Sequence, residues 1–381
     1  MRATVLKDAA LTKQAGRFVW LSVDTEKERN VDFIQKFPVD NWPTFFVIDS
    51  VGETAALKWL GTANVAQLEK LMDDGEQAIR TTSGKDPDQL LASADRAFAA
   101  GQRAEGAKLY RESLDKAPPS WPRRPRAVES LVTALQGAAD QEGCARAAMR
   151  ETASLAPGSS FANAAATGLT CALSAPASAG WRGEAIALLE PRVRQALSFP
   201  DLLADDRSGL YDVLVQSREA QGDKEGTKQA AADWLRFLEG EAARAPTPEA
   251  RSAFDSHRLA AALKLGEPGR VVAPLQSSER DLPQDYNPPA RLAIAYSALG
   301  RYDDALAAAD RALSRVYGPR RIRVLQSKAN IYAKKGDSIA AQRTLEEAVQ
   351  FAETLPVSQR SEKTIERLRA EAAKAGQAAS R

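Results

Sequence analysis

The residues best suited to chemistry in this sequence are its two cysteines, Cys144 and Cys171, and its one histidine, His257. A structural zinc normally takes four Cys or His ligands, so three such residues argue against a metal site, and we expect no cofactor. The cysteines stand 27 positions apart (171 − 144), which excludes a Cys-x-x-Cys motif. His257 follows an apolar helical pattern, so we expect a packed or surface side chain and no catalytic residue in this chain.

Charge and hydropathy argue against two further classes of protein, those that bind nucleic acid and those that span a membrane. The 381 residues carry a formal net charge of +2, with both signs interspersed. The basic clusters are too short for the sustained cationic face that phosphate binding needs, so we expect no nucleic-acid partner. These clusters are Arg123, Arg124 and Arg126, and Arg320, Arg321 and Arg323. No apolar run approaches the roughly 18 residues of a membrane span. Met1–Gln14 lacks the apolar core of a signal peptide and shows helical spacing instead.

The first eighty residues alternate between strand-like and helix-like patterns. Apolar runs with β-rich composition predict a buried strand at Phe18–Val23 and further strands at Thr44–Ile48 and Ala55–Leu60. Apolar residues at helical spacing predict helices at Val31–Phe37 and Val65–Met72. With the helical pattern of the first fourteen residues, the predicted order is helix, strand, helix, strand, strand, helix.

That order resembles the thioredoxin superfamily over about 75 residues. The resemblance rests on the segments FVWLSVD and FPVDNWPTFFVID and on the glycine after the last strand, Gly61. The resemblance implies that Pro43 is a cis-proline and that Trp42, Pro43 and Thr44 form a loop that pairs with a substrate peptide. The alternative is that Pro43 only starts an edge strand.

The sequence departs from that family at its beginning. The family's first strand-helix-strand unit and its Cys-x-x-Cys helix have no counterpart after Met1. One explanation is that the protein begins upstream and is a thiol–disulfide oxidoreductase; the other is a truncated, redox-inactive domain whose strands re-pair or are completed by a partner. An upstream signal segment would place the protein in the periplasm, and otherwise we expect it in the cytoplasm.

From about Pro87 onward, helical patterns come in pairs separated by Gly or Pro. Tyr296 and Gly300 recur 36 positions later as Tyr332 and Gly336, and Gly266 stands 34 positions before Gly300. This spacing resembles the tetratricopeptide repeat, in which small residues let paired helices approach and a glycine ends the first helix of each pair. We expect about seven helix pairs over residues 87–355, after a linker at Arg80–Asp86, and a capping helix with a tail over 356–381.

The repeat resemblance implies a protein or peptide partner bound on a concave face, for which we name the first-helix residues Arg291 and Ser327. The alternative is that both are ordinary surface residues. In a stacked array, Cys144 would lie near the start of a second helix and Cys171 near the end of the next first helix. These ends are neighbours, so either a Cys144–Cys171 disulfide, which argues for an oxidising compartment, or two separate thiols are compatible with the pattern.

We therefore expect an α+β, mostly α fold: an incomplete thioredoxin-like domain over residues 1–80, followed by an α-solenoid. The favoured function is a redox-inactive protein-binding scaffold, and the alternative is a fragment of a thiol–disulfide oxidoreductase. The patterns specify neither the partner's identity nor the oligomeric state.

Overall fold

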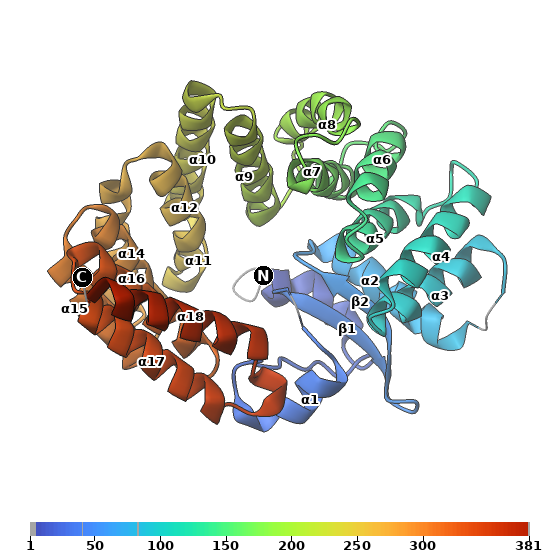
Figure 1. The fold of residues 1–381 in the computed structure, drawn as a ribbon. Helices are drawn as coiled ribbons and strands as arrows, with labels where there is room; N and C mark the ends of the chain where they lie inside the picture. Colours follow the sequence, from blue (N-terminus) through green and yellow to red (C-terminus); the bar gives the residue numbers. More distant parts are fainter. Residues whose placement is uncertain (1–4, 40, 82–83, 380–381) are drawn as a thin grey trace. The chain divides into compact units, whose positions relative to one another are not determined.

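The computed structural model describes residues 5–39, 41–81 and 84–379, which are mostly helical and include a two-stranded sheet (Figure 1). The chain forms two compact units, which we describe separately. The first comprises the described parts of Met1–Phe18 and Asp40–Asp233, and the second those of Val19–Val39 and Trp234–Arg381. The segment Val19–Val39 therefore belongs to a different unit from the residues on either side of it.

The sheet of the first unit pairs β1 (Thr44–Asp49) with β2 (Thr54–Leu60) in antiparallel orientation. Helix α2 (Val65–Arg80) follows, and its start is fixed by Asn64, whose side chain accepts a hydrogen bond from the Gln67 N–H. One face of α2 and inward residues of β2 share an apolar cluster: Leu57, Trp59, Leu68, Leu71 and Met72. The predicted strand–strand–helix order from Thr44 onward is confirmed, but this small sheet does not show a thioredoxin-like domain.

The helix predicted over Met1–Gln14 is wrong for the described part of that range. Residues 5–14 form two short 3₁₀ helices, η1 (Val5–Lys7) and η2 (Ala9–Gln14), and residues 1–4 lie outside the described residues. The Asp8 side chain accepts a hydrogen bond from the Ala10 N–H at 2.9 Å. This local bond starts a new helix at Ala9 and interrupts a continuous one.

The strand predicted at Phe18–Val23 is also wrong. Val19 and Leu21 are 88% and 73% exposed, and an isolated bridge from Phe18 to Ala15 is the only β-type pairing that the described residues show there. A strand needs a partner for its N–H and C=O groups. Within the described residues the sheet consists of β1 and β2 alone, so an apolar, β-rich run has no ladder to join.

The remainder of the first unit is a succession of helices, in which each helix from α3 to α9 contacts the next. They are α3 (Pro87–Ala99), α4 (Arg103–Lys116), α5 (Arg124–Gly137), α6 (Gln141–Glu151), α7 (Ser159–Ser174), α8 (Arg182–Ala196), α9 (Ala204–Ala220) and the first part of α10 (Lys224–Arg244). Small residues permit the close packing: a Cβ on Gly168 would lie 2.2 Å from the Cβ of Ala148. Of the linker predicted at Arg80–Asp86, residues 82–83 lie outside the described part.

The second unit continues with paired helices. They are α11 (Pro248–Ser252), α12 (Asp255–Leu265), α13 (Val272–Asp281), α14 (Asn287–Ala298), α15 (Tyr302–Leu313), α16 (Arg320–Lys335), α17 (Ser338–Thr354) and α18 (Glu362–Ala379). Gly266, Gly300 and Gly336 stand at or just beyond the ends of α12, α14 and α16 with φ of 84°, 73° and 90°. Only glycine adopts this backbone region without a steric cost, which confirms that these glycines end the first helices.

The segment Val19–Val39 is packed with these C-terminal helices. It contains the 3₁₀ helix η3 (Glu28–Asn30) and the short helix α1 (Val31–Lys36), which matches the helix predicted at Val31–Phe37. Helix α1 contacts η5 (Val357–Gln359), which lies in the turn between α17 and α18 (Figure 1). The segment thus contacts residues more than 300 positions away in the sequence.

Candidate protein-interaction surface

The loop at Trp42, Pro43 and Thr44 leads directly into β1. The Trp42–Pro43 peptide bond is cis, as the resemblance implied. Trp42 is 50% exposed, and the carbonyl of Pro43 accepts a hydrogen bond from the Gly61 N–H at 2.9 Å. The Pro43 carbonyl is therefore already hydrogen-bonded to the residue that follows β2. A peptide-binding role for the loop stays a prediction.

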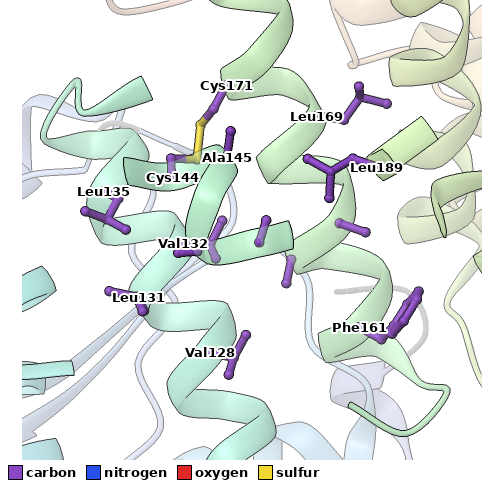
Figure 2. Packing of buried hydrophobic residues seen from close by; sticks show 14 of the residues in the cluster. Val128, Leu131, Val132, Leu135, Cys144, Ala145, Phe161, Leu169, Cys171 and Leu189 are labelled. Carbon is purple, nitrogen blue, oxygen red and sulfur yellow. A yellow bond between two sulfur atoms is a disulfide. The ribbon is translucent and has the colours of Figure 1, made fainter. Parts of the chain in front are cut away.

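Cys144 and Cys171 come together in the interior of the first unit, on α6 and α7. Their Sγ atoms are 2.06 Å apart and their Cα atoms 6.2 Å apart, which is a disulfide (Figure 2). Both residues are buried among apolar side chains of α5, α7 and α8 in the largest core cluster. Because the two sulfur atoms are bonded to each other, neither cysteine is a free thiol in this structure.

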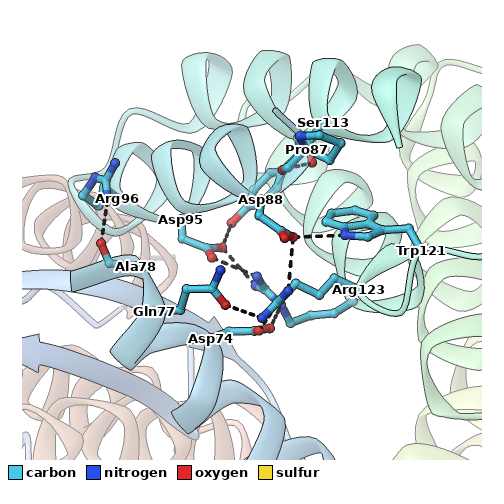
Figure 3. Close-up of polar contacts among 12 residues, drawn as sticks. Asp74, Gln77, Ala78, Pro87, Asp88, Asp95, Arg96, Ser113, Trp121 and Arg123 are labelled. Atoms are coloured by element: carbon cyan, nitrogen blue, oxygen red, sulfur yellow. Dashed lines mark hydrogen bonds and ion pairs between the residues drawn. The ribbon is translucent and has the colours of Figure 1, made fainter. Parts of the chain in front are cut away.

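The basic cluster at Arg123, Arg124 and Arg126 is directed into the protein. Arg126 forms two hydrogen bonds with Asp95 on α3, at 3.0 and 2.9 Å, and an ion pair with Asp74 on α2 at 2.6 Å. Arg123 donates to Asp74 at 2.6 Å and to Asp88 at 3.1 Å (Figure 3). Acidic side chains therefore occupy the guanidinium groups of Arg123 and Arg126, and the expectation of no nucleic-acid partner stays a prediction.

The buried side chains of Tyr110 and Asp95 belong to the same network of hydrogen bonds and ion pairs as Arg126. The Tyr110 hydroxyl donates to Asp95 at 2.6 Å, and burial together with the Asp95 charge raises the pKa of Tyr110 well above its usual value. Burial opposes the charge of Arg126, but Asp95 and Asp74 outweigh it and raise its pKa. The network therefore joins α2 to α3, α4 and α5 by fixed charges, and we assign it a structural role.

Two further carboxyl groups in the first unit, the buried Glu129 and the half-buried Asp206, form no ion pair that the described residues show. Glu129 on α5 accepts a hydrogen bond from the Asn163 amide at 2.7 Å, and burial raises its pKa to about 7. Asp206 on α9 accepts a hydrogen bond from the Thr62 hydroxyl, and burial raises its pKa to about 6. Among the described residues no group of three or more His, Cys, Asp or Glu side chains could hold a metal ion.

We expect Glu129→Gln to stabilise the protein relative to the parent by about 3 kcal/mol at pH 8 and by less than about 1 kcal/mol at pH 5. The native carboxyl keeps a proton up to about pH 7, whereas the unfolded chain releases it near its ordinary value of 4.5. The free energy of unfolding of the parent therefore falls as pH rises across this window, and the neutral glutamine removes that fall. Urea titrations at both pH values measure the difference.

The exposed carboxylate of Asp115 on α4 provides the matched control. Asp115→Asn removes the same charge in the same unit without a burial effect. A pH-independent difference between Glu129→Gln and the parent would contradict the raised pKa of Glu129.

The two repeat residues named from the sequence lie on α14 and α16, which contact each other in the second unit. We call these exposed and half-buried side chains of the two helices the α14/α16 face: Arg291, Ile294, Arg323, Ser327, Asn330 and Lys334. The α16 members recur at helical spacing on one side of that helix. Arg323 and Lys334 are exposed, and neither forms an ion pair within the described part of the chain. The face therefore presents unneutralised positive charge beside an apolar side chain, Ile294, which is 40% exposed.

The two residues named from the sequence lie on this face. Arg291 is on α14 and Ser327 on α16, and both are half-buried. Burial lowers the pKa of Arg291, although the nearby acids Asp255 and Asp285 oppose the shift. A concave shape for this face stays a prediction. His257, one repeat earlier on α12, is half-buried beside Trp234, with ring centroids 6.4 Å apart.

Comparisons with known proteins support repeats in this region. A family model described as tetratricopeptide repeat matches residues 286–354, which contain α14 to α17. No curated protein matches the chain. No helix in the described residues is both long and apolar enough to cross a membrane.

Several solved structures are similar in part. A tetratricopeptide repeat protein from Parabacteroides merdae ATCC 43184 has 9% identity and a TM-score of 0.48, covering 76% of this chain and 100% of that one. The TPR2AB domain of yeast Sti1, in complex with pHSP90, has 14% identity and a TM-score of 0.29, covering 75% and 98%. A thermophilic TPR protein of Thermus thermophilus has 14% identity and a TM-score of 0.25, covering 76% and 98%. None of these matches indicates a thioredoxin-like domain.

Proposed function

We propose that this protein is a protein-binding scaffold, redox-inactive in the sequence given, whose C-terminal repeats hold a partner on the α14/α16 face. The observation that carries the proposal is the row of exposed cations on α16 within the matched repeats, Arg323 and Lys334, which no acidic side chain of the described residues neutralises. A partner with complementary charge would be attracted to such a row and oriented by it.

The resemblance to the thioredoxin superfamily remains a proposal about the segment from Trp42 to Arg80. Its support is the strand–strand–helix order and the cis-proline before β1. An oxidoreductase would need a cysteine pair other than Cys144 and Cys171, because both are buried in the repeats and bonded to each other. We therefore propose no redox activity for this sequence and keep the peptide-binding loop as a second, untested contact.

The scaffold proposal is tested by site-specific photo-crosslinking in the native cell. A photoreactive residue at Ser327 is expected to trap a protein partner, and the same residue at Lys363 on α18 is not. Arg323→Glu with Lys334→Glu should reduce the Ser327 adduct at least fivefold, because it reverses two charges on the face.

The charge-matched control is Lys363→Glu with Lys374→Glu, since both lysines are exposed on α18. It makes the same change in net charge away from the face. If both double variants reduce the adduct equally, or if Ser327 traps nothing, the α14/α16 face is not the binding surface.

A further inference from the structure

A short acidic segment of the chain is already bound at one end of the α14/α16 face. The Tyr317 hydroxyl donates a hydrogen bond to Asp24 Oδ2 at 2.6 Å. Arg320 Nε donates to Glu26 Oε1 at 2.9 Å. Between these acidic residues, the carbonyl of Thr25 accepts a hydrogen bond from the Gln359 amide at 3.1 Å. Two carboxylates and one backbone carbonyl are thus recognised by three side chains of the second unit.

The fit at this contact is close. A Cβ on Gly318 would lie 2.4 Å from the Glu26 carbonyl oxygen, so the approach requires the glycine that is present. The Glu26 side chain is only 14% exposed, and Lys27 Nζ lies 5.9 Å from the centre of the Tyr317 ring. Asp24–Lys27 forms a turn, in which Asp24 also accepts a hydrogen bond from the Glu26 N–H at 3.0 Å. The surface therefore holds a compact Asp-x-Glu turn by shape as well as by charge.

The electrostatics of the contact favour ionised acids. Partial burial of Asp24 opposes its charge, but the hydrogen bond from Tyr317 and the nearby cations outweigh burial and lower its pKa. The same hydrogen bond raises the pKa of Tyr317 to about 12, so the phenol stays a donor at physiological pH. The contact also lies at the start of α16, where the helix dipole favours negative charge.

The contact with Asp24 and Glu26 covers only the first residue of a longer row of polar and cationic side chains along α16. Arg320 stands three and seven positions before Arg323 and Ser327, so all three lie on the same side of α16. Beyond Arg320 the cations of this row are exposed. The chain's own acids therefore occupy the first position of a surface that continues along the helix.

We propose that Tyr317, Arg320 and Gln359 form a recognition site for short acidic segments of the Asp-x-Glu type, and that Asp24–Glu26 is its resident intrachain occupant. A protein partner carrying such a segment competes for the site and extends along Arg323 toward Lys334. This inference rests on the scaffold function proposed above and names the chemistry of the partner. An intrachain occupant acts at a local concentration in the millimolar range, so it weakens binding of a competing peptide without abolishing it.

The test is fluorescence anisotropy with a labelled peptide that has the sequence of residues 21–30. In the full chain, Asp24→Asn with Glu26→Gln should release the occupant, and the peptide is expected to bind on the order of tenfold more tightly than to the parent chain. Adding Arg320→Ala should abolish binding. A peptide with Asn in place of Asp24 and Gln in place of Glu26 should not bind to either chain.

Glu28→Gln with Asp32→Asn is the matched control, because it removes two exposed charges from the same segment. It should leave peptide affinity at the parent value. Equal affinity for parent and Asp24→Asn/Glu26→Gln chains, or no binding to either, would overturn the inference. The crosslinking result at Ser327 would still stand in that case, so failure of this site is distinguishable from failure of the scaffold function.

Discussion

Arg126→Ala is expected to destabilise the first unit by about 3–5 kcal/mol, the largest effect of any single substitution proposed here. Arg126 is 11% exposed and balances Asp74 and Asp95, which are 8% and 2% exposed. Removing the guanidinium takes from the buried Asp95 the one ion pair that the described residues show for it, and it leaves Asp74 with Arg123 alone. Because Asp74 lies on α2 and Asp95 on α3, we expect the contact between α2 and the repeat helices to loosen first.

Urea unfolding and hydrogen exchange of the α2, α3 and α5 amides measure this effect. The comparison variant is Arg146→Ala, which breaks an exposed ion pair with Glu142 one turn away on α6 and should cost less than about 0.5 kcal/mol. Arg126→Lys keeps the charge but loses the two-pronged geometry, and we expect an intermediate loss. A loss below about 1 kcal/mol for Arg126→Ala would show that the network does not stabilise the unit.

Replacing both Cys144 and Cys171 with alanine is expected to lower the stability of the first unit by about 3.5 kcal/mol. We propose that the pair is bonded in the native protein. A cross-link between residues 27 positions apart restricts the unfolded chain, and loop-closure entropy gives a cost of that size when the link is removed. Alanine is a suitable replacement because both sites are buried among apolar side chains.

Thermal unfolding of the oxidised parent, the reduced parent and the double variant provides the measurement. The reduced parent should unfold close to the double variant, because both lack the cross-link. Thiol titration of the denatured, unreduced protein should find no free thiol. Two free thiols, or equal stability of oxidised and reduced parent, would contradict the bonded pair.

Local patterns in the sequence predicted much of the architecture. The strands β1 and β2 and the helix α2 follow from short apolar runs, and the first helices end at Gly266, Gly300 and Gly336. Each of these features depends on residues that are neighbours in the chain. The match of a tetratricopeptide model to residues 286–354 reflects the same local spacing.

The candidate site could be predicted only in part. Repeat position led to Arg291 and Ser327, whose role in binding stays a proposal, but Asp24, Glu26 and Tyr317 were missed. The available signal was the acidic Asp-x-Glu turn and the basic start of α16, and nothing in the sequence joined them. The hydrogen bonds that join them span 293 and 294 positions.

The sequence alone therefore determined the helices, their glycine ends, the β-hairpin and the small number of reactive residues, because local propensity and spacing control these features. The tertiary structure decided that Phe18–Val23 is not a strand, since no partner strand is described for it, and that Arg126 is buried with Asp74 and Asp95. It also placed Asp24–Glu26 against Tyr317 and Arg320. Pairing of backbone groups and of charges between distant segments depends on which surfaces meet in three dimensions, and local pattern does not encode that.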